Sequence, residues 1–224
     1  MPRVVLSIEM LPLLLTATLA KTPIRVFPLD TVHGLELHGA SLNSAIHKGK
    51  RCVELTELQD PNLGDLAVIK GLDFHNGTIE FDEAGLLTKT ARPSSRSFVG
   101  IAFRVSDDGT GYENFYLRMT NGRSPEQELR NHAVQYCSLP NHPWNELRAT
   151  KPFRYEAYTD LVLGAWTHVK ISVEGTEAKF YVNRAAQPTL VVHDLLHGDS
   201  HGKIALFVAG HTRGFFRNLR VRPA

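Results

Sequence analysis

The stretch from residue 168 to residue 183 reads HVKISVEGTEAKFYVN. Val169, Ile171 and Val173 alternate with polar residues, so their side chains are expected on one face of a strand. The alternation resumes after Gly175, which stands where the chain would reverse. This pattern predicts a β-hairpin with one buried face.

Similar short runs recur along the rest of the chain between turn residues. They are rich in β-branched and aromatic residues, for example LAVIKG at 66–71, GTIEFDE at 77–83, FVGIAFRV at 98–105 and GKIALFV at 202–208. We find no long amphipathic helical pattern. Many short strands at this spacing are typical of an all-β sandwich or barrel.

Length and composition fit a soluble globular protein. The 224 residues suffice for one large β domain, and the apolar and charged fractions of 42% and 21% are ordinary. Lysine and arginine total 25 against 23 acidic residues, without long runs of one sign, so we expect no nucleic-acid partner.

The first twenty residues, MPRVVLSIEMLPLLLTATLA, resemble a secretory signal peptide. Arg3 precedes an apolar run that ends in Ala20, after which we predict cleavage. Glu9 and Pro12 interrupt the run, so a stable membrane span is not expected, and a retained apolar segment is the alternative. The sequence therefore predicts a secreted or periplasmic protein.

The two cysteines, Cys52 and Cys137, each lie in a strand-like run. In an exported chain they could pair, whereas separate buried thiols are the commoner state of isolated cysteines. The sequence leaves both alternatives open.

Polar residues alternate with apolar ones in the strand at 77–83. Ile79 and Phe81 share one face, so Glu80 and Asp82 lie side by side on the other. Such a face is either a solvated sheet surface or the acidic part of a site.

The strands that follow offer further polar side chains by the same alternation: Arg104, Asn114, Tyr116, Arg118 and Gln135. If these strands are neighbours of the first, their side chains and the two carboxylates line one surface. Carboxylates and amides bind sugar hydroxyls, arginine fixes orientation, and aromatic rings stack on a pyranose. We interpret the set as a candidate carbohydrate-binding surface, with a solvated face as the alternative.

The segment at 138–160, SLPNHPWNELRATKPFRYEAYTD, reads as a long loop rich in aromatic residues. Long loops in compact domains are often functional. Trp144 lies between Pro143 and Asn145, so we expect it in an exposed turn where it stacks on a sugar. The alternative is a loop that packs its rings against the edge of the sandwich.

A family resemblance rests on several of these stretches in order: FHNGTIEFDE, FVGIAFRVSDDGTGYENFYLR, AVQY, WTHVKISVEGTEAKFYVN, PTLVVHDL, GKIALFV and FFRNLRV. Over residues 74–221 the chain resembles the concanavalin A-like lectin and glucanase superfamily, and more narrowly the bacterial laminin-G-like proteins related to the 3-keto-disaccharide hydrolase family. The resemblance implies an all-β jelly-roll sandwich of two antiparallel sheets over residues 21–224. It also implies export and carbohydrate recognition or cleavage.

Glycoside hydrolysis is a second interpretation of the acidic pair. Glu80 and Asp82 lie about 6.5 to 7 Å apart along a strand. Catalytic carboxyl groups lie about 5 to 5.5 Å apart in retaining enzymes and about 6.5 to 9.5 Å apart in inverting ones. The laminarinase-type members of the superfamily carry Glu, Asp and Glu at alternating positions, whereas here Glu83 directly follows Asp82, which departs from that pattern. Glu83 joins the acidic face only if a bulge resets the alternation.

Metal chemistry is not expected. His193, His197 and His201 are spaced by four, but the strand-like TLVVHD and Gly198 argue against a helix that would gather them, so we interpret them as exposed loop residues. The SDDGTG stretch at 106–111 reads as a simple turn. We predict no cofactor.

The function expected from the sequence is an exported β-sandwich that recognises a carbohydrate. One alternative is a hydrolase of a glycoside or a modified disaccharide, with Glu80 or Asp82 as acid or base and Arg104 as charge partner. Another is a non-catalytic interaction module. The sequence names neither the sugar nor the oligomeric state.

Overall fold

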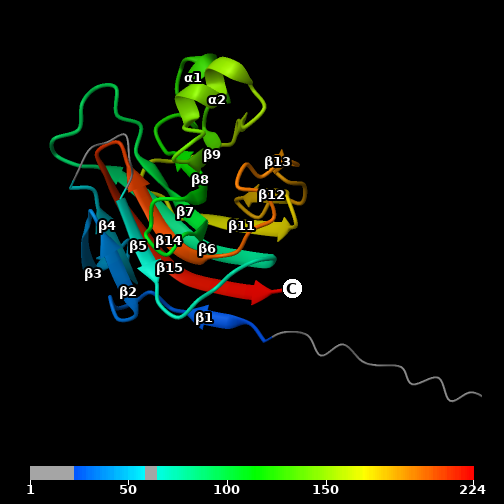
Figure 1. The fold of residues 1–224 in the computed structure, drawn as a ribbon. Coiled ribbons are helices and arrows are strands. Elements are labelled where there is room, and N and C mark those ends of the chain that lie inside the picture. The colour runs from blue at the N-terminus through cyan, green and yellow to red at the C-terminus, as the bar shows by residue number, and fades with distance from the viewer. Residues whose placement is uncertain (1–22, 59–64) are drawn as a thin grey trace, which may run out of the picture.

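The computed structural model describes residues 23–58 and 65–224, which form two antiparallel β-sheets (Figure 1). The predicted signal peptide lies outside the described residues. Among the helices of the described part, none is long and apolar enough to cross a membrane.

One sheet, here sheet A, contains both terminal strands of the described chain. Its strands are β1 (Arg25–Phe27), β3 (Ser41–His47), β4 (Lys50–Thr56), β6 (Gly77–Leu87), β11 (Thr167–Glu174), β12 (Glu177–Val182), β13 (Leu190–Val192) and β15 (Thr212–Pro223). They follow the order β13-β12-β11-β6-β15-β4-β3, and β1 pairs with β15.

The second sheet, here sheet B, holds the remaining strands: β2 (Leu35–His38), β5 (Asp65–Ile69), β7 (Phe98–Val105), β8 (Tyr112–Arg118), β9 (Val134–Leu139), β10 (Glu156–Ala157) and β14 (Lys203–Ala209). Their order is β10-β9-β8-β7-β14-β5-β2. Two short helices, α1 (Gln127–Asn131) and α2 (Trp144–Thr150), lie near the β9 end (Figure 1). The stretch predicted as a long loop therefore contains α2 and β10.

The predicted hairpin is confirmed as β11 and β12. Val169 pairs with Val182 and Ile171 with Phe180, and the apolar residues of both strands are buried in alternation. Gly175 has a φ of +55° in the connecting turn, a conformation that glycine adopts without steric cost.

The hydrophobic core lies between the two sheets. Phe115 on β8 stacks on Phe180 on β12, with ring centroids 4.1 Å apart, so the contact joins sheet B to sheet A. Burial of one such phenylalanine stabilises the fold by about 2 kcal/mol. The predicted all-β sandwich of two antiparallel sheets is confirmed.

The two cysteines are free, buried thiols on different sheets. Cys52 belongs to β4 and Cys137 to β9. The structure thus favours separate thiols over a disulfide.

Candidate functional site

The acidic pair lies on the outer face of sheet A, as the alternation in β6 predicted. Ile79 and Phe81 are buried, whereas Glu80 and Asp82 are half-buried on the opposite side. Asp82 lies 2.9 Å from Nδ1 of His168 on β11 and accepts a hydrogen bond of 2.8 Å from the side-chain amide of Asn218 on β15. Its carboxylate is therefore held by the two neighbouring strands.

The polar residues of β8 and β9 lie on sheet B instead. Asn114 and Tyr116 stand opposite Cys137 and Gln135, so these four side chains share one face, as expected. Phe115 between them stacks on Phe180 of sheet A, so this face is turned away from sheet A. It is buried all the same, since each of the four residues is at most 3% exposed. The expectation that the acidic pair completes the same surface is wrong, because the chain passes from sheet A to sheet B between β6 and β7.

Arg118 is the centre of a buried polar cluster on this face of sheet B. One Nη donates to the Tyr116 hydroxyl at 3.1 Å and to Gln135 Oε1 at 2.9 Å, and the other donates to Glu156 Oε1 at 3.1 Å and to the carbonyl of His132. The Arg118 side chain is only 3% exposed. Its donors are thus occupied within the protein.

Helix α2 adds the remaining members of this cluster. Arg148 donates to both carboxylate oxygens of Glu156, at 2.5 and 3.2 Å. The ring of Trp144 lies between two guanidinium groups, 5.3 Å from that of Arg118 and 4.7 Å from that of Arg148. Burial lowers the pKa of His132, whose Nδ1 lies 2.9 Å from Glu156. Trp144 is therefore half-buried in the cluster, and the exposed turn expected around it is not found.

Arg104 occupies a third location. It has a φ of +53°, which interrupts the alternation of β7, and its residue is 2% exposed. Its guanidinium donates to the carbonyls of His75, Gly175 and Gly198. Burial lowers the pKa of this group. Arg104 thus joins three loops and does not face Glu80, so the expected charge pair is wrong.

Glu83 keeps the alternation of β6 and turns into the core. It lies opposite Thr167 and Phe216 and has no exposed surface. The bulge that would bring it to the acidic face is not present at this position, because the pairing with β15 shifts only between Arg217 and Arg220.

The histidines at 193, 197 and 201 do not converge, as the loop interpretation predicted. His193 lies 2.6 Å from Glu177, and His201 lies 3.0 Å from Asp73. Asp108 accepts hydrogen bonds from Ser106 and Thr110, which makes the predicted turn. Residues 23–58 and 65–224 contain no group of three side chains placed to hold a metal ion.

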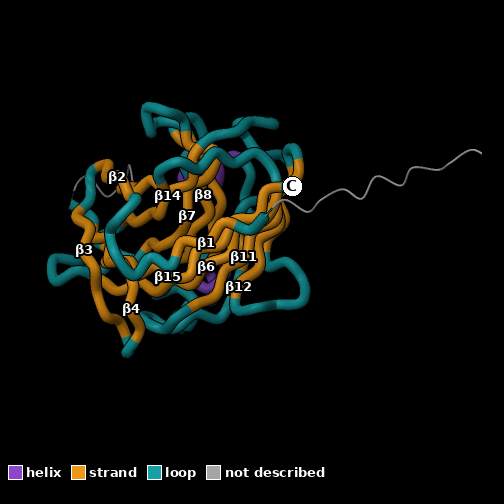
Figure 2. The backbone as a smooth tube through the Cα atoms, turned by 90° about the horizontal axis from the view of Figure 1, so that it is seen from below, coloured by secondary structure: helices purple, strands orange, loops and turns teal. Residues whose placement is uncertain are grey.

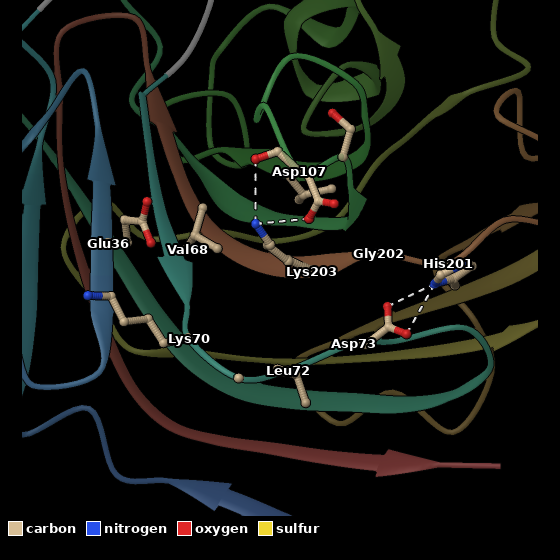
Figure 3. A pocket seen from close by; sticks show the side chains of 12 residues that line it. Glu36, Val68, Lys70, Leu72, Asp73, Asp107, His201, Gly202 and Lys203 are labelled. Carbon is tan, nitrogen blue, oxygen red and sulfur yellow. Dashed lines mark hydrogen bonds and ion pairs between the residues drawn. The ribbon is translucent and has the colours of Figure 1, made fainter.

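A pocket of about 660 Å³ opens at the end of sheet B (Figure 3). Four segments far apart in the sequence line it, namely β2, the end of β5 with the turn that follows, the end of β7 with its turn, and the start of β14. The charged lining residues are Glu36, Lys70, Asp73, Asp107, His201 and Lys203, and the apolar ones are Val68, Leu72 and Val105. We refer to it as the sheet B pocket.

Two ion pairs flank the sheet B pocket. Nδ1 of His201 lies 3.0 and 3.1 Å from the two carboxylate oxygens of Asp73, and Nζ of Lys203 lies 3.1 Å from Asp107 Oδ1 (Figure 3). Most of these groups reach solvent, because Asp73, Asp107 and His201 are exposed. Their polar atoms are thus available to a ligand.

Gly202 holds the two sides of this site together. It exchanges backbone hydrogen bonds of 2.7 and 3.1 Å with Phe74. A Cβ at this position would lie 2.5 Å from the carbonyl oxygen of Val105, so only glycine allows this approach. The close packing sets His201 and Lys203 beside the turns that carry their partners.

The pocket combines the groups that bind sugar hydroxyls. Carboxylates accept hydrogen bonds from sugar hydroxyl groups, and lysine ammonium groups donate hydrogen bonds to sugar oxygens. An apolar floor packs against the C–H groups of the sugar ring. Three carboxylates against two lysines make the lining slightly acidic when His201 is neutral. Such a lining suits a neutral sugar better than an anionic one.

The sequence pointed to this site only in part. His201 and Asp107 belong to stretches that the sequence predicts as a loop and a turn, whereas Glu36 lies within β2 and Lys70 and Asp73 follow β5, all three without any motif. Only the pairing of distant strands brings them together.

Comparisons with known proteins identify the fold. No family model and no curated protein matches the chain. Among solved structures it is similar to the carbohydrate-binding module CBM66 from Bacillus subtilis, with a TM-score of 0.59, 15% identity and coverage of 84% of this chain and 95% of that one. It is also similar to peanut lectin (TM-score 0.57, 10% identity, 90% and 97% covered) and to a glycosidic hydrolase (0.54, 12%, 93% and 99%).

Proposed function

We propose that the protein recognises a carbohydrate, and that the sheet B pocket binds a neutral sugar unit. The observation that carries the proposal is the open pocket of about 660 Å³, which presents exposed carboxylates and ammonium groups around an apolar floor. The fold supports it, because a carbohydrate-binding module, a lectin and a glycosidic hydrolase have similar structures.

The positions of the carboxyl groups with a raised pKa favour recognition over hydrolysis. A glycoside hydrolase needs a carboxylic acid that stays protonated at working pH. Burial raises the pKa of Glu83 and of Glu57. Glu83 lies in the core, and Glu57 accepts hydrogen bonds from the backbone N–H groups of His211 and Thr212, so neither lines the pocket.

A glycan array followed by calorimetry tests the proposal. Asp73→Asn and Lys203→Gln should each weaken binding of the sugar found on the array by about tenfold, because a charged hydrogen bond is worth about 1.5 to 3 kcal/mol. Asp160→Asn is the matched control, since Asp160 pairs with Arg123 on the surface and does not line the pocket.

The outcomes separate the functions considered. Binding without release of sugar, lost in the two pocket variants and kept in the control, supports the proposal. Release of sugar products would instead favour the hydrolase, whose candidate carboxylates remain Glu80 and Asp82. An array without any bound sugar would favour an interaction module and overturn the proposal.

Export is part of the proposed function. Its basis is the leader-like sequence of residues 1–20, which predicts a mature chain that begins at Lys21.

A further inference from the structure

The outer face of sheet A carries a row of polar side chains across four neighbouring strands. Tyr181 on β12 stands opposite Lys170 on β11, Lys170 opposite Glu80 on β6, and Glu80 opposite Arg220 on β15. Residues directly opposite one another in adjacent strands point to the same face. Figure 2 shows β12, β11, β6 and β15 side by side. The register thus places Lys170 on one side of the Glu80 carboxylate and Arg220 on the other.

Cations without a carboxylate partner surround this row. Among the described residues, no ion pair involves Lys170, Arg184, Arg220 or Arg222. By contrast, Lys179 of the same sheet lies 2.6 Å from Glu177, and Arg213 lies 2.6 Å from Glu54. Lys50 and Arg51 on β4 also form no ion pair among the described residues, but they line neither of the hollows on this face. Unpaired positive charge is thus present on β11, on β15 and in the turn after β12.

Two hollows lie on this face, one over β11 and β12 and the other over β6 and β15. One, of about 390 Å³, is lined by His168, Lys170, Tyr181 and Arg184, among others. The other is smaller, about 70 Å³, and its lining includes Glu80, Arg220 and Arg222. Unpaired cations thus line both hollows.

The carboxylates on this face indicate which polyanion fits. A sugar acid presents one carboxylate and several hydroxyl groups per unit, so it needs cations with hydrogen-bond acceptors between them. Glu80 lies between Lys170 and Arg220 and supplies such an acceptor.

We propose that the outer face of sheet A binds an acidic polysaccharide. Lys170, Arg220 and Arg222 pair with its carboxylates, and Glu80 accepts hydrogen bonds from its hydroxyl groups. This surface and the sheet B pocket share no lining residue, so the proposal holds whether or not that pocket binds sugar.

Binding of the full chain to polygalacturonate tests the proposal. The triple variant Lys170→Gln, Arg220→Gln and Arg222→Gln should bind about tenfold more weakly at low salt, because three exposed ion pairs with the polymer are lost and such pairs are least screened there. The control removes the same charge outside sheet A with Lys89→Gln, Arg92→Gln and Lys151→Gln, all exposed residues.

The proposal predicts that the control triple variant binds polygalacturonate like the wild type and that this binding weakens as the salt concentration rises. A methyl-esterified polymer, which lacks the carboxylate charges, should not bind. Circular dichroism and melting curves verify that both triple variants are folded. If both triple variants lost binding to the same extent, net charge alone would explain the loss, and the proposal would be overturned. Equal binding of the esterified polymer, or binding of phosphatidylglycerol vesicles but not of polygalacturonate, would overturn it as well.

Discussion

Glu83 should make the stability of this protein fall as the pH rises. Its carboxyl group has no exposed surface, and within the described residues neither oxygen has a hydrogen-bond partner. Burial raises the pKa of Glu83 well above its ordinary value of 4.5. The folded protein therefore holds a proton that the unfolded chain releases.

The sign and size of the effect follow from linkage. Stability is fully present below the ordinary pKa and is lost as the pH rises toward the raised one, at about 1.4 kcal/mol per pH unit. Over this range the wild type should lose stability steadily as the pH rises. Glu83→Gln has nearly the same shape but cannot ionise, so it should match the wild type near pH 5 and exceed its stability at pH 7.

Urea denaturation of both proteins at several pH values measures this difference. Glu80→Gln is the control, because Glu80 lies on the same strand but on the outer face, half-exposed to water. A second contrast is Glu113, a buried carboxylate that accepts hydrogen bonds from the Tyr136 hydroxyl at 2.6 Å and the His197 backbone N–H at 2.9 Å. Glu113→Gln should destabilise the protein by about 1 to 3 kcal/mol. A difference between wild type and Glu83→Gln that does not change from pH 5 to pH 8 would refute the reasoning.

Trp144, Arg104 and the leader-like sequence of residues 1–20 each lead to one further prediction. Trp144→Ala should cost about 2 kcal/mol of stability, because the ring packs between two guanidinium groups; an unchanged melting temperature with lost sugar binding would restore the ligand role expected from the sequence. Arg104→Met should cost about 3 kcal/mol in urea denaturation, because it removes the hydrogen bonds by which a buried guanidinium joins three loops, whereas Arg123→Met on the surface should cost less than about 0.5 kcal/mol. Mass spectrometry of protein from the native host should find Lys21 at the amino terminus, and an intact Met1 in the cytosol would contradict export.

Alternation within single strands predicted which side chains share a face at every candidate site residue of β6 and β8, but not at Arg104. It placed Glu80 with Asp82, and Tyr116 with Arg118, as the structure has them. It does not determine which strands are neighbours, because pairing depends on contacts between residues far apart in the chain. The assumption that consecutive strands pair therefore placed β6 beside β7, although β11 and β15 are its partners.

Two departures from regular geometry account for other differences. The positive φ of Arg104 turns its side chain toward the loops at the end of the sandwich, and no neighbouring residue in the sequence indicates it. The sheet B pocket gathers short polar stretches from four separate segments. Each stretch has ordinary turn chemistry, so only the assembled fold distinguishes them from other turns.

Residue type alone also fails to tell a ligand surface from an internal network. Arg118 and Arg220 both occupy polar positions of alternating strands, and the sequence offers the same argument for each. Arg118 is buried because Glu156 and helix α2 supply its partners, whereas Arg220 is exposed opposite Glu80 and, among the described residues, forms no ion pair. A ligand requires hydrogen-bond donors that are free and accessible. Whether the donors of an arginine are free depends on segments distant in the sequence, and this decides between Arg118 and Arg220. For this reason we place the anionic ligand on sheet A, although the sequence favoured the arginine that sheet B buries.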